Sequence, residues 1–312
     1  MGTPSALAVV AWISLVLLLD ADGSLWLQRG LGLLTWLLLL TALSRMRPTV
    51  RAQTAVVVVF ATAVEYTFSP LLEVYTYRFD NVPAYVPPGH GLVYLAALGL
   101  GHSSVVRAHL RASTAAVLAV GGAWATYGVT VSDRPDWLGM FWFGCLVGFL
   151  FWGPSRELYV GAFVVVSYLE LVGTAVGAWQ WQPRDPTGLV PIGNPPSGAA
   201  GGYGWFDLAG LLLAGPLLAR WASWRAPFGS PLKDRCGDRG AARRDRAGCP
   251  HCRPRPRDRT APAARAAHHG RRRESARRRP SRHRAADRWS TARLDRAVQG
   301  ARPARRTAHP PR

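Results

Sequence analysis

Long apolar runs recur along the first three quarters of the chain and constrain its fold more than any other feature. A helix that crosses a lipid bilayer needs roughly 20 mostly apolar residues. In hydrocarbon every backbone polar group must be paired within the protein, and a helix meets that requirement alone. Candidate spans lie at 4–20, 25–44, 53–73, 88–106, 113–131, 137–153, 157–178 and 205–223. The sequence therefore predicts an all-α, polytopic transmembrane helix bundle of about eight spans.

Charge divides the chain into two parts near Lys233. Residues 1–233 hold 13 Lys and Arg against 11 Asp and Glu, whereas residues 234–312 hold 25 Arg against 7 acids. The second part is rich in Arg, Ala, Pro and Gly and has no apolar periodicity, so it cannot bury a hydrophobic core. We expect a transmembrane bundle over 1–233 and a disordered, Arg-rich tail over 234–312.

The tail has three competing interpretations. The first is a cytoplasmic segment that contacts anionic lipid head groups. The second is an out-of-frame translation product, because GC-rich DNA read in another frame yields this composition. The third, nucleic-acid binding, is the weakest, because charge alone attracts phosphate without specifying a sequence. Cys249 and Cys252, with Cys236, make only half of a zinc site, so we expect no metal there.

The short loops between the predicted spans alternate in charge. Asp20, Asp22, Asp80, Asp133, Asp136 and Asp185 fall on one side. Four basic residues share that side, namely Arg29, Arg78, Arg134 and Arg184. Nine basic residues fall on the other side, namely Arg45, Arg47, Arg51, Arg107, Arg111, Arg156, Arg220, Arg225 and Lys233. Basic residues favour the cytoplasmic side. We therefore expect a cell (inner) membrane protein with both termini in the cytoplasm, and a first helix that is retained rather than removed as a signal peptide.

Two stretches, 65–89 and 170–198, share a pattern. Each has a Glu inside an apolar run, then an aromatic-x-aromatic triplet, then a Val-Pro-x3-Pro-Pro loop that ends in Gly. The copies lie in the third and seventh predicted spans, an offset of four, so both have the same orientation, which favours a parallel duplication of a four-helix unit. The alternative is coincidence, since Pro-Pro and aromatic pairs are common at membrane interfaces.

Glu65 and Glu170 are the strongest candidates for chemistry. Each lies about 12 residues into its predicted span, near the middle of the membrane. An ionisable group there costs several kcal/mol and usually faces a cavity or a partner. A buried carboxyl is expected to be neutral, because desolvation disfavours the charged form, and a neutral carboxyl can donate a proton. The alternative is a structural hydrogen bond between helices.

Two further acids complete the candidate catalytic set. Glu73 follows Pro70, which should kink its helix, and Asp207 opens the last span, where it could instead be a helix cap. The candidate substrate-binding residues are Tyr75, Tyr77, Arg78, His90, Trp179, Trp181, Tyr203 and Trp205. Their structural alternatives are an interfacial aromatic belt, an ion pair of Arg78 with Glu73, and a loop histidine.

The pattern Glu-x-x-Gly-Thr-x-x-Gly-x-aromatic-x-aromatic at 170–181 resembles a motif of the multi-pass carotenoid biosynthesis proteins that include bacterioruberin-type hydratases. The stretch 65–83 is similar to it. The resemblance implies a helical membrane enzyme that adds water across a terminal isoprenoid double bond. It casts one of Glu65 and Glu170 as proton donor and the other as the base that orients water. The residues implied to shield a cation are Tyr75, Tyr77, Trp179 and Trp181. The chain also resembles multi-pass membrane proteins of actinobacteria.

The leading interpretation is a membrane enzyme that acts on an isoprenoid, a carotenoid or another lipid by acid-catalysed alkene chemistry, with its site in the outer half of the bilayer. The alternatives are a proton-coupled or lipid transporter and a non-catalytic membrane assembly protein. No nucleotide-binding loop, metal-ligand set or serine triad is evident in the sequence, so no cofactor is expected. The expected partners are membrane lipids and an isoprenoid substrate.

Overall fold

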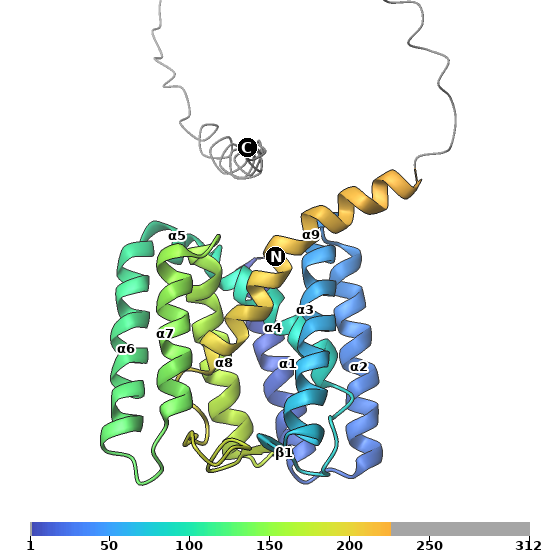
Figure 1. Cartoon of the computed structure of the whole chain (residues 1–312). Coiled ribbons are helices and arrows are strands. Elements are labelled where there is room, and N and C mark those ends of the chain that lie inside the picture. The colour runs from blue at the N-terminus through green and yellow to red at the C-terminus, as the bar shows by residue number, and fades with distance from the viewer. Residues whose placement is uncertain (1, 226–312) are drawn as a thin grey trace, which may run out of the picture. The chain divides into compact units, whose positions relative to one another are not determined.

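The structure is a computed structural model that describes residues 2–225; the predicted tail at 234–312 lies outside these residues. The described part is helical, with two short strands (Figure 1). Its helices are α1 (Thr3–Ala21), α2 (Leu25–Ser44), α3 (Pro48–Tyr66), α4 (Val86–Gly101), α5 (Ser104–Ala108), α6 (Leu110–Thr130), α7 (Trp137–Trp152), α8 (Arg156–Ala175) and α9 (Ala199–Arg225). A π-helical turn, η1 (Thr67–Leu71), follows α3, and the strands are β1 (Tyr75–Tyr77) and β2 (Trp179–Trp181).

The bundle has two distinct ends. At one end α1 begins and α9 ends, which we call the terminal face; the strands lie at the opposite end, the sheet face (Figure 1). Among the described residues, six helices are long and apolar enough to cross a membrane: α1, α2, α3 extended by η1, α6, α8 and α9. The chain is therefore a multi-pass integral membrane protein.

Two of the predicted spans are shorter than expected. α4 and α7 contain 16 residues each, which corresponds to about 24 Å of helix, against about 30 Å of hydrocarbon. α4 ends at Gly101, short of the predicted end at residue 106, because the Ser103 side chain caps α5 by accepting from the Val106 N–H. The predicted eight spans thus become six helices of spanning length and two shorter ones.

The sheet-face end of α3 is shaped by Pro70. Proline has no N–H to donate and its ring clashes with the preceding turn, so the α-helix ends at Tyr66 and continues as η1. Glu73 follows with a φ of 51°, in the left-handed region, and turns the chain toward β1. The kink expected at Pro70 is therefore a change of helix type, followed by a left-handed residue that leads into β1.

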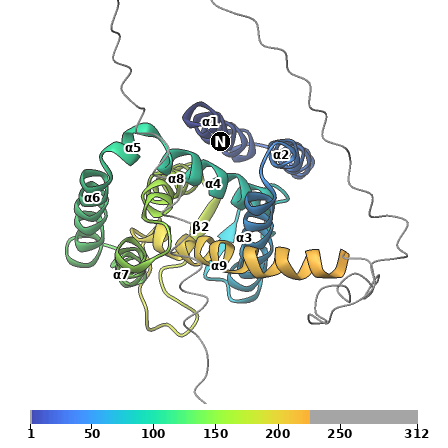
Figure 2. The same cartoon turned by 90° about the horizontal axis from the view of Figure 1, so that it is seen from above.

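Four helices form the centre of the bundle. α3 packs along α9, and α4 packs along α8. Figure 2 shows these four around β2, with α1 and α2 to one side and α6 and α7 to another. Glycines bring the backbones together: a Cβ on Gly161 would meet the Ala97 carbonyl oxygen, and one on Gly101 would meet that of Glu157. Small residues commonly allow such close approach in membranes.

The two strands form one small antiparallel sheet. Tyr75 lies opposite Trp181, Thr76 opposite Gln180, and Tyr77 opposite Trp179. Because side chains alternate along a strand, the two tyrosines and the two tryptophans share the buried face of the sheet. The aromatic triplets of the two similar stretches therefore pair with each other.

Two aspartates that we assigned to loops on charge alone are buried and fix the fold of the sheet face. Asp136 accepts hydrogen bonds from the N–H groups of Gly139, Gly193 and Ser197 and from the Ser197 hydroxyl. Asp20 accepts from the Tyr85 hydroxyl and the Gln28 amide. Each aspartate thereby holds one of the two Val-Pro-x3-Pro-Pro loops.

Candidate functional site

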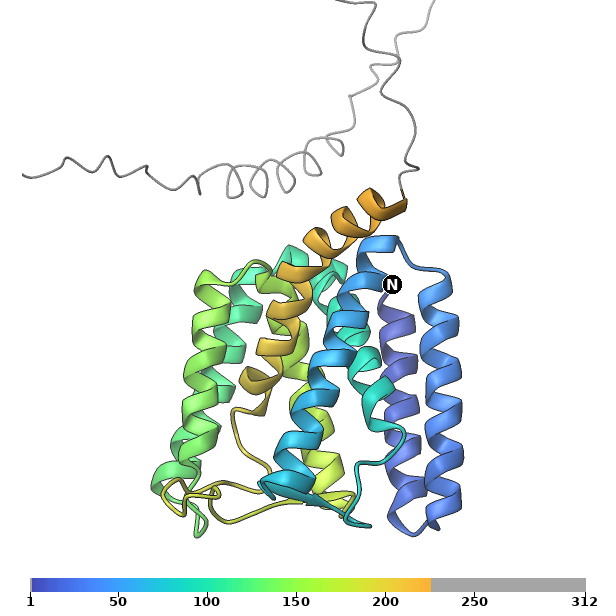
Figure 3. The same ribbon diagram turned by 45° about the vertical axis from the view of Figure 1, so that its right-hand side comes forward.

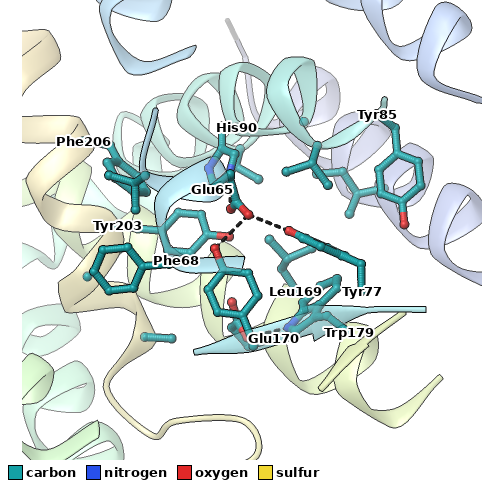
Figure 4. Close-up of a pocket in the computed structure, with 18 of the residues that line it drawn as sticks. Glu65, Phe68, Tyr77, Tyr85, His90, Leu169, Glu170, Trp179, Tyr203 and Phe206 are labelled. Atoms are coloured by element: carbon teal, nitrogen blue, oxygen red, sulfur yellow. Dashed lines mark hydrogen bonds and ion pairs between the residues drawn. The ribbon is translucent and has the colours of Figure 1, made fainter. Parts of the chain in front are cut away.

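A cavity of about 280 Å³ lies at the centre of the bundle, next to the sheet. Its walls are mainly apolar and aromatic side chains from α1, α3, α4, α8 and α9 and the buried face of the sheet. Figure 4 shows Glu65 and Glu170 among the residues that line it. Both are buried, with 6% and 3% of their surface exposed. Two carboxyls that are far apart in the sequence therefore line the same, mainly apolar cavity.

Glu65, in the last turn of α3, has a hydrogen-bond partner for each carboxyl oxygen. Its Oε2 accepts from the hydroxyls of Tyr75 and Tyr77, both at 2.8 Å, and its Oε1 lies 2.8 Å from Nε2 of His90 in α4 (Figure 4). Burial, reinforced by the Glu65 carboxyl, raises the pKa of Tyr75 and of Tyr77 well above its usual value. Both hydroxyls therefore stay protonated and act as donors.

Glu170, near the end of α8, is held differently. Its Oε2 accepts from the indole N–H groups of Trp179 and Trp181, each at 3.1 Å. Gly173 makes room for this arrangement, because a Cβ there would overlap the Trp179 ring. Within residues 2–225, no group donates to its Oε1. Glu170 therefore has one carboxyl oxygen available to a molecule in the cavity.

The sheet gathers four aromatic rings over the two carboxyls. The Tyr75 ring lies 4.5 Å from that of Trp181, and the Tyr77 ring lies 6.2 Å from that of Trp179, measured between centroids. The two tyrosine hydroxyls donate hydrogen bonds to Glu65, and the two indole N–H groups donate to Glu170. Each carboxyl takes its donors from its own half of the sequence, so both halves use a Glu and the aromatic pair that follows it.

His90 connects Glu65 to α9. Its ring stacks on Tyr203 with centroids 5.1 Å apart and makes an edge contact with Phe206 at 5.5 Å. While Nε2 faces Glu65, Nδ1 is buried without a hydrogen-bond partner among the described residues. His90 is thus part of the site rather than a loop histidine.

The other predicted site residues lie in different places. Tyr203 and Trp205 line the cavity, and Trp205 is also 49% exposed at the outer surface of the bundle. Arg78 lies outside the cavity lining and donates to the Gly23 carbonyl oxygen at 2.6 Å. Its ion-pair partner is Asp20, at 3.5 Å, and not Glu73, which is exposed. Asp207 is buried in α9, outside the cavity lining.

Several cavity residues were not predicted from the sequence. The most informative are Phe60 in α3, Trp142 in α7 and Phe206 in α9, with Trp12 and Ile13 from α1. They are ordinary apolar positions of membrane helices, so no local pattern separates them from lipid-facing ones. Tyr85 could have been found, because it lies inside the first Val-Pro-x3-Pro-Pro loop.

The fold and the site together define a multi-pass helical membrane protein with a central, aromatic-lined cavity that contains two differently held carboxyls. Within residues 2–225, no group of three or more His, Cys, Asp or Glu side chains could hold a metal ion. Comparison with known protein families, with curated proteins and with solved structures finds no match to the chain.

Proposed function

We propose that the protein is a membrane enzyme that protonates a carbon–carbon double bond of an unsaturated, isoprenoid-type lipid chain. The observation that carries this proposal is that Oε1 of Glu170 accepts no hydrogen bond from any described residue and belongs to a cavity lined mainly by apolar and aromatic side chains. A positioned carboxylic acid is an effective proton donor, and aromatic faces stabilise a cation. An apolar cavity selects a substrate without charge, since burying an unpaired charge is costly.

The two glutamates take separate roles in this proposal. Glu170 gives its proton to one alkene carbon, the π electrons form the new C–H bond, and a tertiary cation remains at the other carbon. A water molecule adds its oxygen to that cation and loses a proton to Glu65, which yields an alcohol. Where no water reaches the cation, Glu65 removes a neighbouring C–H proton instead, and the double bond moves.

The cavity wall supports entry of the chain from the bilayer. Phe60 and Trp205 line the cavity and are also 39% and 49% exposed on the surface of the bundle. Their rings pack against Phe206 and Phe149, respectively. A lipid chain can therefore reach the carboxyls between such side chains without passing through water.

We also propose that the bundle arose by duplication of a four-helix unit and that its sheet face is external. Exchange of the two halves converts the α3–α9 contact into the α8–α4 contact, and both are extensive. The register of the sheet is symmetric about Thr76 and Gln180. In this topology α4 and α7 complete eight passes, and both termini are cytoplasmic, in agreement with the basic loops.

Deuterium incorporation tests the enzymatic proposal whatever the product is. The purified protein in lipid nanodiscs is incubated in D₂O with isoprenoid lipids extracted from its host, with squalene as an acyclic standard, and products are read by mass spectrometry. We expect carbon-bound deuterium with the wild type and at least tenfold less with Glu170→Gln. Glu157→Gln, a change in the same helix outside the cavity lining, is the control. Incorporation that is unaffected by Glu170→Gln, or absent with the wild type, rejects the proposal.

Proton-coupled transport is the second candidate, and the buried acid Asp207 between the cavity and the terminal face favours it. In proteoliposomes, lipid or proton flux that depends on an imposed membrane potential would support transport. Deuterated product that forms without a membrane potential supports the enzymatic proposal.

A further inference from the structure

A second layer of polar side chains lies between the cavity and the terminal face. It takes one residue from each central helix: Gln53 of α3, Tyr94 of α4, Tyr159 of α8 and Asp207 of α9. The Tyr94 hydroxyl donates to Oε1 of Gln53 at 3.0 Å. Gly210, one turn after Asp207, packs against the backbone of Gln53. α9, which contains Asp207, packs against both α3 and α8.

This layer contains polar groups that the fold leaves unpaired. Asp207 is 5% exposed and has no hydrogen bond to any residue that the structure describes. Tyr159 is fully buried, and its hydroxyl also lacks a partner there. A buried polar group without a partner costs roughly 1–3 kcal/mol, and more if it is charged. Tyr159 and Asp207 lie on α8 and α9, which pack against each other, and unpaired polar groups on two packed helices indicate a function other than stability.

On both α4 and α9, a residue of the second layer lies one helical turn after a residue that lines the cavity. On α4, Tyr94 follows His90 by four residues; on α9, Asp207 follows Tyr203 by four. Residues at this spacing share a helix face and are separated by about 6 Å along the axis. Since His90 and Tyr203 stack on each other, the two layers are adjacent. On the cavity side, Nδ1 of His90 is the buried polar atom that has no hydrogen-bond partner among the described residues.

The second layer is also close to the terminal face. Tyr159 is in the first turn of α8, which begins at Arg156, and Gln53 is five residues after the start of α3 at Pro48. A proton from water at this face therefore has about two helical turns or less to travel to Asp207. Chains of Asp, Glu and His inside membranes commonly carry protons.

We propose that Asp207 and His90 form a proton path between the terminal face and Glu65. Asp207 takes a proton from water and gives it to Nδ1 of His90; the ring releases its Nε2 proton to Oε1 of Glu65 and then returns to its first tautomer. One proton moves per cycle, and the reverse sequence removes one. The other titratable groups of the second layer are Tyr94 and Tyr159, and the titratable groups in contact with His90 are Glu65 and Tyr203. In the proposed reaction, on which only the purpose of the path rests, Glu65 gains a proton, and the reverse sequence removes that proton after each turnover.

Infrared spectroscopy after a rapid pH change tests the path without any substrate. The full chain in nanodiscs is monitored in the carboxyl C=O region, and the band of Glu65 is assigned by its loss in Glu65→Gln. We expect Asp207→Asn to slow the change of this band tenfold or more, Asp207→Glu to restore it, and Asp22→Asn, which alters an exposed acid, to leave it unchanged.

An unchanged rate in Asp207→Asn, or a Glu65 band that never responds to pH, would overturn the proposal. If Asp207→Asn does not fold, His90→Gln decides, because glutamine keeps a hydrogen bond to Glu65 but cannot relay a proton: a slowed Glu65 band supports the path and an unchanged one rejects it. These outcomes are separate from those of the deuterium experiment. Proton exchange at Glu65 can persist in a protein that protonates no alkene, and an alkene can be protonated by Glu170 in a protein that lacks this proton path.

Discussion

Asp136 is the residue on which the second Val-Pro-x3-Pro-Pro loop depends. Its carboxylate accepts four hydrogen bonds, three of them from backbone N–H groups. Truncation to alanine leaves those donors unpaired in a buried place, so we expect Asp136→Ala to lower the free energy of unfolding by about 3 kcal/mol. Thermal unfolding in detergent measures the effect.

Asp133→Ala is the matched control for this prediction, because Asp133 is an exposed acid three residues before Asp136, between α6 and α7. It should change the unfolding temperature little, since surface substitutions are usually nearly neutral. Equal effects of the two variants would contradict the role given to Asp136.

Because Tyr75 and Tyr77 are buried, we expect the protein to lose stability at alkaline pH. Their pKa is raised in the folded protein by burial and then by Glu65, whereas in the unfolded chain a tyrosine ionises at about pH 10. Their contribution to stability is therefore complete below about pH 10 and is lost as pH rises above it. We expect the unfolding temperature to fall less steeply above about pH 10 in Tyr75→Phe/Tyr77→Phe than in the wild type.

The control for the alkaline prediction replaces two exposed tyrosines. Tyr66 and Tyr127 are 55% and 56% exposed, so Tyr66→Phe/Tyr127→Phe should follow the wild-type pH profile. The prediction fails if both double variants give the same slope.

At the scale of residues, the sequence identifies which side chains need an explanation but not all of their partners. Glu65 and Glu170 stand out because an acid inside an apolar run is costly wherever it lies. The structure brings both to one cavity with the aromatic pairs that follow them. Asp20 and Asp136 could not be recognised as buried, because their partners come from loops as many as 65 residues away. Nothing local in the sequence encodes such a contact.

The close contact between α4 and α8 requires that Gly161, like Gly101, has no side chain. A Cβ there would meet the carbonyl oxygen of Ala97, a backbone atom that cannot rotate away. We expect Gly161→Ala to force the helices apart and to lower the free energy of unfolding by about 2 kcal/mol. Unfolding by heat or by denaturing detergent reports the change.

Gly144 of α7 supplies the control, because an added Cβ there meets nothing within 4 Å. Gly144→Ala should be neutral or stabilise the helix by up to about 1 kcal/mol. Loss of stability in Gly144→Ala equal to that in Gly161→Ala would show that the helices respond to any added methyl group.

At the scale of elements, apolar length predicts where helices lie better than where they end. The long runs became helices, since hydrocarbon leaves a backbone few alternatives. The end of α3 was set by Pro70, and the end of α4 by the cap of α5. The pairing of β1 with β2 could not be predicted, because three-residue strands carry almost no signal of their own and are stabilised by the rings around them.

The topology of the whole molecule is testable with two exposed residues. Val105 in α5 lies at the terminal face and is 67% exposed, and Leu189, between β2 and α9, is 78% exposed. In a background without the four native cysteines, we expect Leu189→Cys to react with an impermeant maleimide added to intact spheroplasts. Val105→Cys should react only after the membrane is opened. The reverse pattern would place the sheet face in the cytoplasm.

The cavity belongs to the whole molecule and to no single segment. α4 and α9 both begin inside the bundle, next to the cavity, at Val86 and Ala199 (Figure 3). Toward the sheet face, the wall is completed by Tyr85, from the loop before α4, and by the buried face of the sheet. Such a space follows from how helices from both halves pack, so the sequence predicted its acids but not its shape.

The symmetric register of the sheet has a consequence for the site under the proposed duplication. A single four-helix unit could build such a cavity as a pair of identical subunits, with equal strands crossing at a central residue. In such a pair the two carboxyls would be chemically equivalent and would have the same role. Fusion into a single chain frees each copy to mutate alone. Two phenols and an imidazole now surround one acid, and two indoles hold the other, so donor and acceptor of a proton can be different residues.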